Sequence, residues 1–107
     1  MTALQQSIYM GAGLPRVTIA KLRDLVRAFA YSVSVHAADE LDDDNLTILD
    51  LEAIILSGSV VEHQRDRITK EVKHVVRGVT LAGEEAECIV KIGPTGRLFV
   101  ITVYLDR

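Results

Sequence analysis

Two residue types in this sequence, cysteine and histidine, could supply nucleophilic or metal-binding chemistry. Cys88 lies between Glu87 and Ile89, and neither neighbour would activate a thiol as a nucleophile. Three histidines occur at positions 36, 63 and 74. They show no chelating spacing, and no second cysteine is present to complete a zinc site. We therefore expect Cys88 to be a small buried apolar residue inside a strand.

An acidic run at residues 42–44, followed by Asn45, invites comparison with calcium-binding loops. Counted from Asp42, an EF-hand loop needs glycine at its sixth position and glutamate at its twelfth, where this chain has Thr47 and Ala53. The run therefore favours a solvated acidic turn. Phosphate-binding, dinucleotide-binding and common hydrolase motifs are also absent from the sequence. The sequence thus predicts no metal and no cofactor.

Length and composition indicate one small globular core. The chain has 107 residues, of which 49% are hydrophobic and 25% are charged. A single cysteine suits a reducing compartment. Neither a secretory signal nor an apolar run of ~18 residues is visible in the sequence. We therefore expect a cytoplasmic protein without membrane contact.

Charge is distributed unevenly along the chain, whose formal net charge is −3. Residues 36–64 carry eight acidic side chains and neither lysine nor arginine, whereas the segments on either side are net basic. We expect this asymmetry to become spatial, with one acidic side and a separate basic region. The acidic middle would repel the phosphates of a nucleic acid.

Hydrophobic periodicity predicts helices first and strands afterwards. Residues 1–16 are weakly patterned, and we expect a loosely ordered N-terminal arm there. Helices are predicted at residues 18–30, at residues 36–43, and from a cap at Asn45 or Thr47 to Gly58. Strands are predicted at residues 31–35, 59–64, 72–81, 86–92 and 98–105.

These elements predict that residues 17–107 form a single α+β domain. An N-terminal helix and a helical pair should pack on an antiparallel sheet of about four strands. The last two strands are apolar on both faces, so they should lie centrally in the sheet. We expect mostly buried side chains at five positions, which are Ile89, Val90, Val100, Ile101 and Val103.

Six short segments occur in an order and spacing typical of one family. They are residues 36–41 (HAADEL), 46–51 (LTILDL), 58–62 (GSVVE), 76–80 (VRGVT), 88–91 (CIVK) and 100–104 (VITVY). Together they resemble a bacterial family, domain of unknown function 4258, over about residues 20–105. That family is thought to be similar to the RelE and barnase–EndoU–colicin group of small ribonuclease toxins.

The resemblance implies a RelE-like fold and metal-independent cleavage of RNA. Such cleavage needs a proton-transfer group near the 2′-hydroxyl and cations for the charge of the phosphorane. The resemblance assigns these roles to His36, Arg77, Lys91 and Tyr104, with Thr102 as a further candidate. It also implies RNA as a substrate and a protein partner such as an antitoxin.

The chain departs from that family at two positions, because Glu40 and Asp44 stand where members often have arginine. Two acids in place of two cations weaken phosphate binding. A second hypothesis is therefore a non-catalytic binding or regulatory domain that keeps the fold without the chemistry.

Each candidate residue also has a structural interpretation. His36 can satisfy backbone groups at the start of a helix. Arg77 and Lys91 interrupt apolar strands, which favours surface pairing with an acid such as Glu87 or Glu71. The ribonuclease hypothesis predicts that His36, Arg77 and Lys91 line one cleft, whereas the binding hypothesis predicts that they are dispersed.

Overall fold

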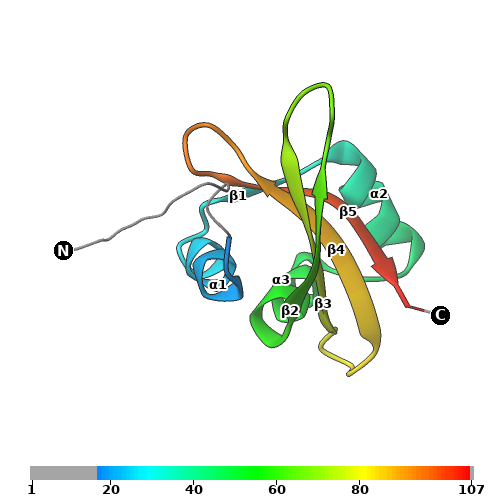
Figure 1. Cartoon of the computed structure of the whole chain (residues 1–107). Coiled ribbons are helices and arrows are strands. Elements are labelled where there is room, and N and C mark those ends of the chain that lie inside the picture. Colours follow the sequence, from blue (N-terminus) through cyan, green and yellow to red (C-terminus); the bar gives the residue numbers. More distant parts are fainter. Residues whose placement is uncertain (1–16, 107) are drawn as a thin grey trace.

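The computed structural model describes residues 17–106 and places three helices and five strands in them (Figure 1). The predicted N-terminal arm at residues 1–16 lies outside the described residues. In chain order the elements are α1 (Ile19–Arg27), β1 (Tyr31–Val33), α2 (Val35–Asp43), α3 (Ile48–Ser57), β2 (Ser59–Arg65), β3 (Val72–Val79), β4 (Glu85–Ile92) and β5 (Leu98–Leu105).

Side-chain caps fix where the three helices begin. Oxygens of Thr18, Ser34 and Thr47 each accept a hydrogen bond from the main-chain N–H three residues further on. In α3 the carboxylate of Asp50 also accepts the N–H of Thr47 at 2.9 Å, which completes a capping box. Of the two caps predicted for this helix, Thr47 is therefore the one used, and every predicted element is present.

The strands form one sheet in the order β1-β5-β4-β3-β2, with β2 to β5 as the predicted antiparallel meander. The prediction of about four strands is wrong by one, because β1 joins the sheet parallel to β5. Arg97 holds β1 in place: its guanidinium donates to the carbonyl oxygen of Tyr31 at 2.7 Å and to Ser32 Oγ at 2.8 Å. A partner for so short a strand could not be inferred from its sequence.

Buried side chains of all three helices share one core with the same face of the sheet. Val76, Cys88 and Val103 form one buried row across three neighbouring strands of that face. Gly78 allows α3 to lie close to β3, because a Cβ at this position would stand 2.1 Å from the carbonyl oxygen of Ile54.

We call the opposite side of the sheet the open face, since none of the described helices packs on it. The side chains on it include those of Val75, Arg77, Glu85, Glu87, Ile89, Lys91, Phe99, Thr102 and Tyr104. The predicted burial of Val90, Val100 and Val103 is confirmed. Ile89 and Ile101 have intermediate exposure, so the expectation that they are mostly buried holds there only in part. Ile89 points to the open face, and Ile101 is the extra residue of a bulge in β5.

Candidate functional site

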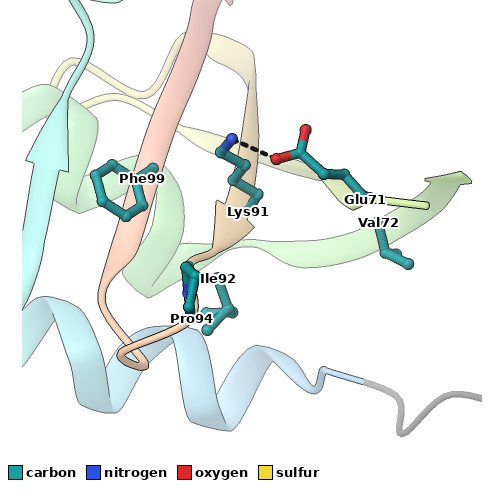
Figure 2. Close-up of a pocket in the computed structure, with 7 residues that line it drawn as sticks. Glu71, Val72, Lys91, Ile92, Pro94 and Phe99 are labelled. Carbon is teal, nitrogen blue, oxygen red and sulfur yellow. Dashed lines mark hydrogen bonds and ion pairs between the residues drawn. The ribbon is translucent and has the colours of Figure 1, made fainter. Parts of the chain in front are cut away.

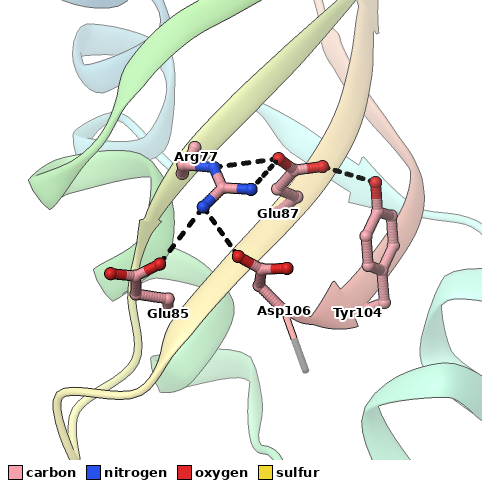
Figure 3. A network of polar contacts seen from close by, with 5 residues as sticks. All are labelled: Arg77, Glu85, Glu87, Tyr104 and Asp106. Atoms are coloured by element: carbon pink, nitrogen blue, oxygen red, sulfur yellow. Dashed lines mark hydrogen bonds and ion pairs between the residues drawn. The ribbon is translucent and has the colours of Figure 1, made fainter.

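Three strands place Arg77, Glu87 and Tyr104 in one row across the open face (Figure 3). Glu87 lies in the middle and binds both neighbours. Arg77 donates to Glu87 Oε2 from Nη2 at 2.8 Å and from Nε at 3.0 Å. The hydroxyl of Tyr104 donates to Glu87 Oε1 at 2.5 Å. This hydrogen bond raises the pKa of Tyr104 to about 12, so its hydroxyl keeps its proton at neutral pH.

Two further carboxylates bind the same guanidinium. Nη1 of Arg77 lies 3.1 Å from Glu85 Oε1 and 2.7 Å from Asp106 Oδ2 (Figure 3). The hydrogen bonds to Glu87 and Asp106 raise the pKa of Arg77. Because three carboxylates surround one cation, this Arg77 cluster carries an excess of two negative charges.

Lys91 also lies on the open face but at a distance from the Arg77 cluster. It is four residues beyond Glu87 on β4, or about 13 Å along the strand. Its Nζ lies 2.8 Å from Glu71 Oε2 (Figure 2). Lys91 and Glu71 help to line a hollow of about 520 Å³, together with Val72, Ile92, Gly93, Pro94 and Phe99.

His36 lies in the first turn of α2, and its side chain is 68% exposed. Its Nε2 is 3.5 Å from Glu40 Oε2, one helical turn further on. Among the described residues, no hydrogen bond or ion pair joins His36 to Arg77, Lys91 or Tyr104.

The carboxylate oxygen of Glu40 that does not face His36 makes a structural hydrogen bond. Oε1 accepts the main-chain N–H of Val103 at 2.9 Å, and the Glu40 side chain is 23% exposed. The acid that replaces the expected arginine therefore ties α2 to β5. Its contact with His36 uses only the second carboxylate oxygen.

The sequence-predicted candidates thus fall into three places. Arg77 and Tyr104 share the cluster around Glu87, Lys91 pairs with Glu71, and His36 remains on α2. The predicted surface pairing of both cations with Glu87 or Glu71 is confirmed: Arg77 binds Glu87, and Lys91 binds Glu71. Thr102 is half-buried on the open face, opposite Ile89.

Sequence reasoning missed the acids that complete the Arg77 cluster. Alternation along β4 could have shown that Glu85 and Glu87 share one face. Alternation could not have predicted the contact between Asp106 and Arg77, because 29 residues separate them and the register of three strands determines that contact.

A histidine pair was also missed. His63 and His74 are cross-strand partners on β2 and β3, and their Nδ1 atoms lie 2.8 Å apart. His74 is buried, and burial, followed by the neighbouring His63, lowers its pKa. A hairpin register places these residues opposite each other although 11 positions separate them in the sequence.

Cys88 agrees with the sequence interpretation. Its side chain is fully buried, and burial raises the pKa of its thiol to about 12. Within residues 17–106 no three histidine, cysteine, aspartate or glutamate residues lie close enough together to hold a metal ion. None of the helices in this range is long and apolar enough to cross a membrane.

Comparison with known proteins places the chain in a family but gives no activity. No curated protein and no solved structure matches it. The family described as domain of unknown function (DUF4258) matches residues 33–105, which run from the end of β1 to the end of β5. Because this match covers more than half of the chain, the protein belongs to the DUF4258 family.

Proposed function

We propose that this chain is a non-catalytic binding domain that keeps its fold without ribonuclease chemistry. The observation that carries the proposal is the neutralisation of Arg77 by Glu85, Glu87 and Asp106. A buried apolar Cys88 as the single cysteine also fits a cytoplasmic location.

Arg77 is poorly placed to bind a phosphate. Its Nε, Nη1 and Nη2 atoms already donate to carboxylates at 2.7–3.1 Å. Charge-assisted contacts of this kind are the strong ones among hydrogen bonds. A phosphate would have to displace them and would also meet the two excess negative charges of the cluster.

Two of the remaining candidates, Lys91 and His36, are not assembled around Arg77. Catalysis of RNA cleavage needs a proton-transfer group within hydrogen-bond reach of the reacting atoms and cations on the developing charge. Lys91 is about 13 Å along β4 from the Arg77 cluster and already has Glu71 as its partner. His36 interacts with Glu40 on its own helix.

One observation favours the alternative, a RelE-like metal-independent ribonuclease held by a protein partner. The imidazole of His36 is open to solvent and lies beside a carboxylate, an arrangement that can hold and deliver a proton. The alternative requires a substrate to bring its phosphate to α2 without help from Arg77.

The test is RNA cleavage by the purified chain in EDTA, with a fluorescently labelled single-stranded RNA. We expect decay at the rate of buffer alone for both wild type and His36→Ala. Cleavage by the wild type that falls ~10²–10⁴-fold in His36→Ala would overturn the proposal in favour of the ribonuclease.

A second measurement tests whether the carboxylates around Arg77 weaken RNA binding. We expect the double variant Glu85→Gln/Asp106→Asn to bind labelled RNA more tightly than wild type at low salt, because it frees Nη1 of Arg77. The double variant Asp42→Asn/Asp43→Asn is the matched control, since it removes two exposed acids from α2. An equal gain of RNA affinity in both double variants would mean that net charge, and not the release of Arg77, increases RNA binding.

A further inference from the structure

The hollow beside Lys91 arises where two hairpins separate. Pairing between β3 and β4 ends at His74 and Val90. Beyond that point β3 continues only with β2, and β4 only with β5. The hollow of about 520 Å³ lies at this separation and receives side chains from both hairpins (Figure 2). Its volume falls within the range of small-molecule sites.

The lining combines an apolar surface with one cation. Val72, Ile92, Pro94 and the ring of Phe99 supply the apolar part. The Phe99 ring lies directly against Gly93, where a Cβ would stand 2.6 Å from a ring carbon. This glycine therefore leaves room for the ring at the wall of the hollow.

Lys91 is the only cation in this lining, and its partner Glu71 can be replaced. The side chain of Lys91 is 31% exposed and that of Glu71 is 44% exposed. Exposed ion pairs of this kind contribute little to stability. An incoming carboxylate could therefore take the place of Glu71 on Lys91. The side chain of Glu71 would then rotate into the solvent at a small cost in free energy.

We propose that this hollow binds a small monocarboxylate with a flat apolar ring. The carboxylate accepts from Lys91 Nζ, and the ring lies against Phe99 and Pro94. A neutral ligand would not compensate Lys91 for the loss of Glu71, and a cationic ligand would be repelled. A nucleotide is less suitable, because its ribose and doubly charged phosphate would find one cation and a mainly apolar wall. This inference deepens the proposed binding function by naming a ligand class.

The probe for this site is 2-naphthoate. The protein has no tryptophan, so the fluorescence of the probe can be excited and read without interference from that residue. We expect 2-naphthoate to bind wild type at least tenfold more tightly than 2-naphthamide or 2-naphthylmethylamine. Glu71→Gln should bind it more tightly than wild type, because the competing carboxylate is gone.

Lys91→Met should weaken 2-naphthoate binding about 10- to 100-fold, the usual range for losing a hydrogen bond to a charged group. Lys73→Met is the matched control, because it removes the same charge from β3 but does not line the hollow. The control should bind within about twofold of wild type. Urea unfolding curves of both variants show whether a loss of binding reflects loss of the fold.

Equal binding of the amide and the carboxylate, or an unchanged affinity in Lys91→Met, would overturn the inference. Tighter binding of uridine monophosphate than of 2-naphthoate would identify a nucleotide site instead. The RNA cleavage assay is independent of these outcomes. If neither probe binding nor RNA cleavage is observed, the ligand class is wrong while the non-catalytic proposal stands.

Discussion

Replacing Glu40 with alanine should destabilise the protein by leaving a buried donor at the edge of β5 without an acceptor. β1 ends at Val33, so the second half of β5 has no strand on its outer side. Two residues take over the role of that missing strand. Ser34 donates from its N–H to Val100 O and from its hydroxyl to Ile101 O, both at 3.0 Å. Glu40 accepts the N–H of Val103 at 2.9 Å.

The expected magnitude follows from the burial of Val103. Val103 is fully buried, so its N–H is left without a hydrogen-bond acceptor when the carboxylate of Glu40 is removed. A buried donor without a partner costs about 1–3 kcal/mol. The contact with His36 adds little, because that imidazole is 68% exposed. We therefore expect Glu40→Ala to lower the free energy of unfolding by about 1–3 kcal/mol.

Urea unfolding followed by far-ultraviolet circular dichroism measures this loss. Asp39→Ala is the matched control, since it removes the same charge from an exposed position of α2. Glu40→Gln keeps an acceptor oxygen and should lose less than Glu40→Ala. The reasoning is refuted if Glu40→Ala loses no more than Asp39→Ala, or if the amide of Val103 exchanges with solvent no faster in Glu40→Ala than in wild type.

Three further outcomes follow from the packing and the buried groups. Gly78→Ala should cost about 1–3 kcal/mol in urea unfolding, because its Cβ would collide with the backbone of α3. Cys88, whose buried thiol has a pKa raised to about 12, should react with iodoacetamide at pH 8 only when urea unfolds the chain. The pKa of His74 is lower in the folded state than in the unfolded state, so the unfolded state binds a proton at His74 more readily. The free energy of unfolding should therefore fall as the pH drops from about 6.5 through the folded pKa of His74. His74→Gln should flatten that dependence, whereas His36→Gln should leave it in place.

Local patterns were sufficient to predict each helix and strand that residues 17–106 form. Capping residues, the change of period after Gly58 and the turn at residues 93–96 mark the boundaries, and these signals depend only on near neighbours. Alternation along residues 72–79 puts Arg77 and Val76 on opposite faces of a strand, and the structure has them so. The fold class followed because each signal agreed with the others.

The contacts that decide function depend on register between distant segments, which no local pattern encodes. The bulge shifts the register of β5 by one residue and leaves Ile101, a predicted core residue, without a partner on β4. Asp106 reaches Arg77 only because three strands are aligned in one way. The hollow beside Lys91 exists because pairing between β3 and β4 ends at His74 and Val90 while each strand continues in its own hairpin.

Glu40 has a structural role that arginine could not fill at this position. Arginine has five donors and no acceptor, so arginine at this position could not accept the N–H of Val103. Charge alone would favour Glu40→Arg as a way to increase RNA affinity, because it exchanges an acid for a phosphate-binding cation. The same change leaves a buried donor at the edge of β5 unsatisfied and removes the partner of His36. In this chain the acid at position 40 therefore has a structural role, and Glu40→Arg should lower the free energy of unfolding unless a second change gives Val103 another acceptor.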